Sequence, residues 1–116
     1  MNNSPLLSFL GITHKSGNLI FGMDNIKKYI LKKRIKLILT AKDISENSYK
    51  KIKKYSQSKI EILPLEITKE EIKNALGKFS AIIAVKDDND DNFANKIKSF
   101  INPHTNINTL PKGMMI

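Results

Sequence analysis

The chain has 116 residues, of which 41% are hydrophobic, and these values predict one globular domain with a core of its own. The lack of cysteine excludes disulfides, thiolate metal sites and thiol nucleophiles. Lysine and arginine number 20 against 11 aspartates and glutamates, which gives a net charge of +9. A basic excess of this size favours a polyanionic partner, and nucleic acid is the usual one.

The charged residues are unevenly distributed along the chain. Residues 23–36 hold six basic residues and one acid, and residues 42–59 hold six lysines and two acids. The acids gather later, in the segment KDDNDDN at 86–92. This asymmetry favours a basic face that binds nucleic acid; the alternative is a lysine surface that serves only solvation.

No segment suggests a membrane protein. No stretch approaches the roughly 18 apolar residues that a spanning helix needs, and the N-terminal MNNSPLLSFLGI has no basic region typical of a signal peptide. We therefore expect a cytoplasmic protein with no membrane partner.

The first third of the chain predicts a helix, a short strand and a second helix. Ser4 followed by proline is typical of a helix start, and the glycine in HKSGN at 14–18 is typical of its end. The apolar residues 19–21 predict a strand. Over residues 23–33, isoleucines one turn apart and lysines on the other side predict an amphipathic helix.

The middle of the chain predicts a strand, a helix and a second strand. The near-continuous apolar run at 35–43 is typical of a central strand covered on both faces. Residues 44–57 read as a helix with Tyr49 and Ile52 on its buried face and Tyr55 as a further candidate. In the strand at 60–66, Pro64 marks either the end of the strand or an edge position.

The last part of the chain predicts two helices around a buried strand. Thr68 and Glu71 have the spacing of a capping box at the start of a helix over 68–76, which Gly77 closes. Residues 81–85 form the most apolar strand, and residues 92–101 place aromatic and isoleucine side chains on one helical stripe. This alternation predicts a sheet between helical layers, with residues 1–101 as one domain and 102–116 as a polar tail.

The residues of known catalytic and metal sites are absent or badly spaced. His14 and His104 stand in polar, turn-like segments, where a histidine is usually a surface residue. LGKFS at 76–80 lacks the first glycine of a phosphate-binding loop, and the acids at 87–91 lack the glycine and glutamate of a calcium loop. We therefore expect no catalytic residue, no metal and no cofactor.

A candidate binding site lies where the helix at 23–33 begins. Gly22 has no side chain to keep a ligand away, and the first-turn N–H groups of a helix favour a negative group. Lys28 projects from the second turn, and Asp24 and Asn25 have groups that can hydrogen-bond base edges. The alternative for Asp24 is that it only caps the helix.

The order and spacing of several segments resemble a known family. LGITHKSGNLIFGMDNIKKYILKKRIKLILTAKDISENSYKKI, followed by LGKFSAIIAVKD and an amphipathic helix, is similar to the kink-turn-binding ribosomal protein superfamily of the L-seven-Ae and L-thirty-e type. Among its branches the chain looks most like the small bacterial YlxQ-type proteins. The similarity spans about residues 6–101.

The resemblance implies an α/β fold, a three-layer α/β/α sandwich with a mixed four-stranded sheet. It also implies an RNA surface where two loops meet, one at the start of the helix after Gly22 and one before the last strand. Family members read a kink-turn, a sharply bent RNA internal loop, with this surface. The implied partners are structured RNA, such as ribosomal RNA, and ribosomal proteins, and the implied state is a monomer.

The resemblance also assigns roles to individual residues. Gly22 would allow close approach, Asn25 would read guanine edges beside Asp24, and Lys28 would bind phosphate. In the second loop, Phe79 would stack on a base, although packing in the core is an equal alternative. The remaining members of the expected RNA-binding set are Lys27, Lys32, Lys42, Lys78 and Ser80, with Lys33 in the basic surround.

These observations predict a non-enzymatic RNA-binding protein that recognises kink-turn or similarly bent RNA and associates with ribosomes. The main alternative is a protein interaction module or ribosome assembly factor that keeps the fold without kink-turn specificity. An enzyme that acts on a phosphorylated small molecule is a more distant alternative.

Overall fold

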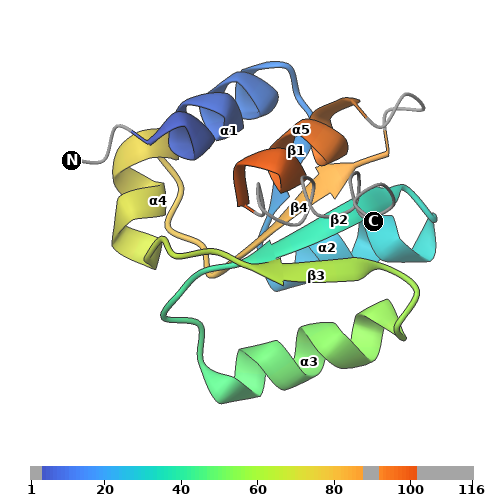
Figure 1. Ribbon diagram of the computed structural model, residues 1–116. Coiled ribbons are helices and arrows are strands. Elements are labelled where there is room, and N and C mark those ends of the chain that lie inside the picture. Colours follow the sequence, from blue (N-terminus) through green and yellow to red (C-terminus); the bar gives the residue numbers. More distant parts are fainter. Residues whose placement is uncertain (1–3, 88–91, 102–116) are drawn as a thin grey trace, which may run out of the picture.

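The computed structural model describes residues 4–87 and 92–101 (Figure 1). The expected polar tail at 102–116, His104 and most of the acidic turn lie outside the described residues. Helices and strands alternate along the described chain, as the sequence predicts. In order they are α1 (Pro5–Lys15), β1 (Leu19–Phe21), α2 (Met23–Leu31), β2 (Ile35–Thr40), α3 (Glu46–Ser56), β3 (Glu61–Pro64), α4 (Lys69–Leu76), β4 (Ile82–Lys86) and α5 (Asn92–Ile101).

The four strands form one mixed sheet in the order β1-β4-β2-β3. Strand β4 pairs antiparallel with β1 and with β2, whereas β2 and β3 are parallel. The apolar runs of β2 and β4 thus lie in the interior of the sheet, as expected for strands covered on both faces. Pro64 is both the last residue of its strand and on an edge strand, so both interpretations of this proline are confirmed.

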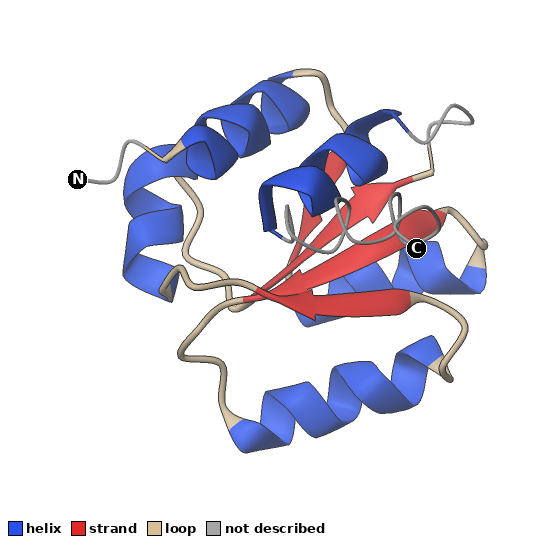
Figure 2. Ribbon diagram, viewed as in Figure 1, coloured by secondary structure: helices blue, strands red, loops and turns tan. Residues whose placement is uncertain are grey.

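Helices cover both faces of the sheet (Figure 2). Helices α1, α4 and α5 pack on one face, over a core that includes Leu37, Leu39 and Ile83. Helices α2 and α3 pack on the other face, over Ile38 and Ala84. Successive residues of a strand point to opposite faces, so one apolar run supplies both cores. The predicted three-layer α/β/α sandwich with a mixed four-stranded sheet is confirmed.

An irregularity in β2 breaks this alternation at the start of the strand. The register between β2 and β4 shifts between Ile35 and Leu37, and Lys36 between them is exposed. Ile35 therefore packs in the core under α2 and α3 with Ile38, whereas Leu37 packs on the opposite face of the sheet. A β-bulge has this effect, because one extra residue turns the preceding side chain to the other face.

The helix ends follow the capping signals in the sequence. The hydroxyl of Ser4 accepts a hydrogen bond from the Leu7 N–H at 3.1 Å, which caps α1. Thr68 and Glu71 form the predicted capping box at α4, and Gly77 ends that helix with a φ of +81°. Helix α2 ends two residues earlier than expected, because Lys33 adopts a left-handed backbone with a φ of +56°.

The prediction that Tyr49 is buried in α3 is wrong. Its side chain is 38% exposed, and the ammonium of Lys53 lies 5.9 Å from the centre of its ring. The buried residues of α3 are Ile52 and Ser56, which stand one turn apart on the face toward the sheet. Tyr49 stands about 60° around the helix from Ile52, so its large ring extends beyond this narrow contact into solvent. Tyr55 is half-buried.

Because Ile52 anchors α3 to the sheet and is fully buried, we expect Ile52→Ala to lower the free energy of unfolding by about 2–5 kcal/mol. The control Ile12→Ala changes an isoleucine that is 56% exposed on α1, and should stay within about 0.5 kcal/mol of the unsubstituted protein. Urea denaturation at 25 °C measures both. Equal, small effects would contradict the packing of α3 described above.

Candidate nucleic-acid interface

Gly22 occupies a backbone conformation that favours glycine. It is the N-terminal cap residue of α2, with φ +92° and ψ 143°. No atom lies within 4 Å of the place where a Cβ would stand, so this side of the backbone is open. No side chain caps this end of α2, which leaves first-turn N–H groups available to a ligand. The start of α2 is therefore an open, electropositive backbone surface.

Two polar side chains stand on the first turn of α2. Asp24 is exposed and is the second residue of α2, whereas Gly22 occupies the N-terminal cap position. The interpretation of Asp24 as the helix cap is therefore wrong. Asn25 is also exposed, and its amide nitrogen donates a hydrogen bond to the Phe21 carbonyl at 3.2 Å. This bond orients the Asn25 amide and leaves its carbonyl oxygen as an acceptor for a donor on a ligand.

Strand β4 brings the second loop, residues 77–81, to the end of the sheet where β1 ends and α2 begins. The Gly22 N–H points to the Ile82 carbonyl at 3.5 Å. On the other side, the Ala41 N–H donates to the Ala81 carbonyl at 2.8 Å, just before Lys42. The end of β1, the end of β2 and the loop before β4 are thus neighbours. The two loops that the sequence marks for RNA binding meet here.

The second loop contains one exposed and one buried candidate. Phe79 is 64% exposed, with the ammonium of Lys69 5.6 Å from its ring centre, so the alternative that Phe79 packs in the core is wrong. Ser80 is buried: its hydroxyl donates to the Ile82 carbonyl at 2.6 Å and accepts from the Ile82 N–H at 3.3 Å. Ser80 thus shapes the loop that presents Phe79.

An open groove of about 330 Å³ joins α2 to the second loop along the edge strand β1. Asn25 and Lys78 line it together, which is the contact between the two predicted halves of the site. Tyr29 and Lys86 also line the groove, with the Lys86 ammonium 5.3 Å from the centre of the Tyr29 ring. The groove thus combines an aromatic face, an amide and two ammonium groups.

The predicted lysines of the site differ in their surroundings. Lys28 is exposed, and within the described part of the chain it makes no ion pair. The Lys27 ammonium lies 4.8 Å from the centre of the Tyr55 ring on α3, and that of Lys32 lies 5.7 Å from the Tyr29 ring. The Lys42 ammonium lies 4.0 Å from a Glu66 carboxylate oxygen, which partly offsets its charge.

Three residues of this surface are missing from the sequence prediction. Tyr29 stands four residues after Asn25, so helical spacing alone puts both on one face of α2. Lys69 follows the capping residue of α4, and its backbone N–H donates to Asp43 Oδ1 at 2.9 Å, which holds it near the loop after β2. Lys86 has no such local signal, because only the pairing of β4 with β1 brings it to the groove.

The described residues show neither a metal cluster nor a membrane span. Among residues 4–87 and 92–101, no three histidine, aspartate or glutamate side chains gather in a way that could hold a metal ion. None of the helices in these residues is long and apolar enough to cross a membrane.

Comparison with known proteins identifies the family. Residues 6–94 match the model of the family described as "Ribosomal protein L7Ae/L30e/S12e/Gadd45 family". A solved structure of a protein of unknown function from Bacillus halodurans C shares the fold, with a TM-score of 0.74 and 23% identity over 85% of this chain and 98% of that chain. Curated protein sequences gave no match. Because the family model spans most of the chain, this protein belongs to the ribosomal protein L7Ae/L30e/S12e/Gadd45 family.

Proposed function

We propose that this protein binds structured RNA without catalysing a reaction, and that its RNA contains a kink-turn or a similarly sharp bend. The observation that carries the proposal is the open backbone at Gly22, which begins the helix that holds Asn25 and Lys28, together with the groove that Asn25 and Lys78 line. Membership of a family of ribosomal proteins supports the same function. The resemblance further supports a small bacterial YlxQ-type protein, a cytoplasmic monomer associated with ribosomes, whose RNA-binding domain spans residues 1–101.

The chemistry of the surface fits bent RNA better than a regular duplex. At Gly22 the RNA backbone can approach the first-turn N–H groups of α2 closely, since no side chain intervenes. The free carbonyl oxygen of Asn25 can accept from the amino group of a guanine edge. A base turned out of the helix would stack on the exposed ring of Phe79. These contacts require a guanine edge and an unstacked base close together, which a sharp bend supplies.

Phosphate contacts would supply much of the affinity. Lys78 and Lys86 line the groove with Asn25, and Lys28 is exposed on the same helix as Asn25. Lys27, Lys32 and Lys42 have partners within the protein, so we expect them to add to the field around the site more than to individual contacts. Such contacts position the RNA, while the polar groups select its shape.

A kink-turn hairpin tests the proposal directly. Fluorescence anisotropy would compare binding of this hairpin with that of the same hairpin whose sheared G·A pairs are replaced by Watson–Crick pairs. We expect clear preference for the intact kink-turn. Equal, salt-sensitive binding to both hairpins would reduce the site to a basic surface, and binding to neither would leave the protein interaction module as the better interpretation.

The substitution Gly22→Ala should weaken binding to the kink-turn hairpin by about tenfold or more, because its methyl group enters the space where RNA approaches. It should also cost about 1–3 kcal/mol of stability through backbone strain. Gly17→Ala is the matched control, since Gly17 has a φ of +81° and equally open space at the other end of β1. It should lose stability and keep RNA affinity. Equal losses of affinity would remove Gly22 from the interface.

Replacing Lys28 by alanine should lower RNA affinity and reduce the slope of log Kd against log salt by about one, as expected for one lost phosphate contact. Lys51→Ala removes an exposed lysine of α3 and should change neither quantity. Binding titrations at several salt concentrations give both slopes. If the two variants behave alike, Lys28 contributes only to net charge.

The ring of Phe79 is too exposed to be needed for folding, so Phe79→Ala should change the free energy of unfolding by less than about 1 kcal/mol. Loss of a stacked base should lower RNA affinity by about 1–3 kcal/mol. Tyr49→Ala is the control, because Tyr49 is also exposed with a lysine ammonium over its ring. Unchanged affinity in Phe79→Ala would exclude the stacking role.

A further inference from the structure

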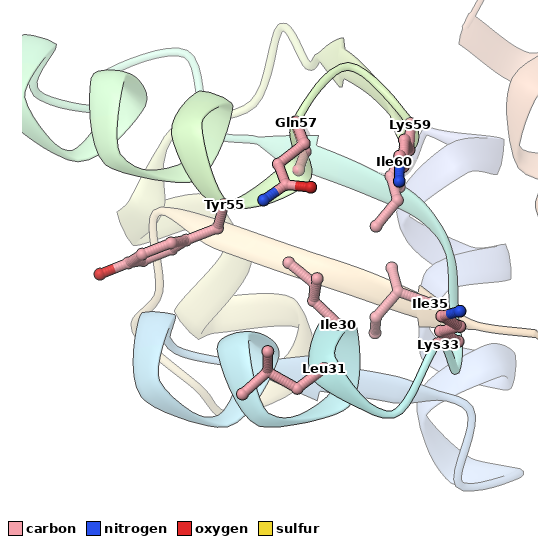
Figure 3. Close-up of a pocket in the computed structure, with 9 residues that line it drawn as sticks. Ile30, Leu31, Lys33, Ile35, Tyr55, Gln57, Lys59 and Ile60 are labelled. Atoms are coloured by element: carbon pink, nitrogen blue, oxygen red, sulfur yellow. The ribbon is translucent and has the colours of Figure 1, made fainter.

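A second, mostly apolar hollow lies at the opposite end of the sheet from Gly22. It has a volume of about 500 Å³ and opens between the C-terminal ends of α2 and α3 (Figure 3). The side chains of Ile30, Ile35 and Ile60 face one another across it (Figure 3). Its size lies within the range of pockets that bind ligands. We call this hollow, with its lining residues, the α2–α3 pocket.

The apolar character of the α2–α3 pocket continues onto the surface. Leu31, at the end of α2, is 75% exposed, the largest exposed fraction among the large hydrophobic side chains of the described residues. Ile35 reaches the pocket because the register shift in β2 turns it to this face. Ile35 is only 8% exposed and belongs to the floor of the pocket, so the apolar surface open to water here is mainly that of Leu31. An exposed leucine at the rim of an apolar hollow offers a contact to the apolar side chains of a partner.

The backbone beside the pocket adopts the left-handed conformation at the ends of two helices. Within the described residues, all three non-glycine residues with positive φ are found here: Lys33 and Gln57 line the pocket, and Ser58 follows Gln57. Their φ values lie between +51° and +61°. At its other left-handed positions the chain uses glycine, at Gly17, Gly22 and Gly77. Lys33 and Gln57 stand where α2 and α3 end, a position at which helices commonly take the left-handed conformation, and here it places their side chains along the pocket.

The rim of the pocket is basic. Lys33 and Lys59 line it, both are exposed, and none of the lining residues is acidic. Arg34, the neighbour of Lys33, is exposed as well. A ligand that fills the pocket with apolar groups therefore meets positive charge at its edge. Charge complementarity requires negative groups next to its apolar ones.

We propose that the α2–α3 pocket binds a short segment of a partner protein in which one or two leucine, isoleucine or phenylalanine side chains are flanked by aspartate or glutamate. The apolar side chains enter between Ile30, Ile35 and Ile60, and the carboxylates pair with Lys33 and Lys59. The proposal goes beyond RNA binding, because the pocket lies at the other end of the sheet. One molecule can therefore hold RNA and this partner at once.

Two other ligands, the bases of a nucleic acid and a second copy of the chain, fit the α2–α3 pocket less well than an acidic protein segment does. Bases stack on aromatic planes, but the floor of the pocket is aliphatic, and the one lining tyrosine, Tyr55, already has the Lys27 ammonium over its ring. A second copy of the chain would bring the same lysines against one another in a symmetric contact, which like charges oppose. An acidic and apolar protein segment satisfies both the floor and the rim.

A display library of random 12-residue peptides, selected on the whole protein and counter-selected on Leu31→Glu, tests the proposal. We expect enriched peptides to combine acidic residues with leucine, isoleucine or phenylalanine. By fluorescence anisotropy, their affinity should fall at least tenfold in Leu31→Glu and in Lys33→Glu. The matched controls Ile12→Glu and Lys51→Glu add the same charge at exposed positions away from the pocket, and should bind as the unsubstituted protein does.

A second variant separates the role of Lys33 from its effect on folding. Lys33→Gly relieves the left-handed strain, so its Tm should rise, while its peptide affinity should fall because the ammonium is gone. Circular dichroism and the same anisotropy assay measure the two effects. A higher Tm with unchanged affinity would remove Lys33 from the proposed contact.

Other outcomes would overturn the proposal. No enrichment, enrichment of basic peptides, or peptides that bind Leu31→Glu equally well would each contradict it. Loss of binding to the kink-turn hairpin in Leu31→Glu would assign the pocket to RNA, and a dimer that Leu31→Glu dissociates would assign it to a second copy. The RNA-binding proposal is tested by binding of the unsubstituted protein to the kink-turn hairpin, and the pocket proposal by binding of the peptides. Failure of one proposal can therefore be told apart from failure of the other.

Discussion

The pairing of β4 with both β1 and β2 is the constraint on which the rest of the structure depends. Because both pairings are antiparallel, Phe21, Thr40 and Ile82 lie at the same end of the sheet, although they are far apart in sequence. The turn at Gly22 and the loop that carries Phe79 therefore become neighbours. An interior strand such as β4 must be apolar on both faces, and this requirement explains the two helical layers.

The two ends of the sheet differ in how they use the left-handed backbone. At Gly22 and Gly77 the chain places glycine, which leaves the backbone open at the end of the sheet where we propose that RNA binds. At the other end, Lys33 and Gln57 adopt the same kind of conformation with side chains attached. Gly17 lies at this other end as well, so glycine and residues with side chains both occupy left-handed positions there.

The basic charge of the chain is likewise divided among several uses. Lys28 is exposed on the helix that begins after Gly22, whereas the Lys27 ammonium covers Tyr55 and that of Lys42 faces Glu66. Lys33 and Lys59 surround an apolar pocket far from Gly22. A net charge of +9 therefore indicates polyanionic or acidic partners in general, and only the placement of each ammonium says which surface it serves.

The helices and strands of this protein, their order, and the part of the candidate site at the start of α2 could be predicted from the sequence. These features depend on local interactions, such as the hydroxyl cap at Ser4, the capping box at Thr68 and the apolar periods of helices and strands. Asn25 and Lys28 were accessible to the same reasoning, because they share a helix with Gly22.

Only the tertiary structure decided which side chains from separate elements meet and which are exposed. The exposure of Phe79 and of Tyr49 depends on how a loop and a helix lie on the sheet, and the groove beside Lys86 depends on the register of β4 against β1. The irregularity that turns Ile35 toward α2 and α3 is also a property of strand pairing. Such features arise from contacts between residues distant in sequence, and no local pattern encodes them.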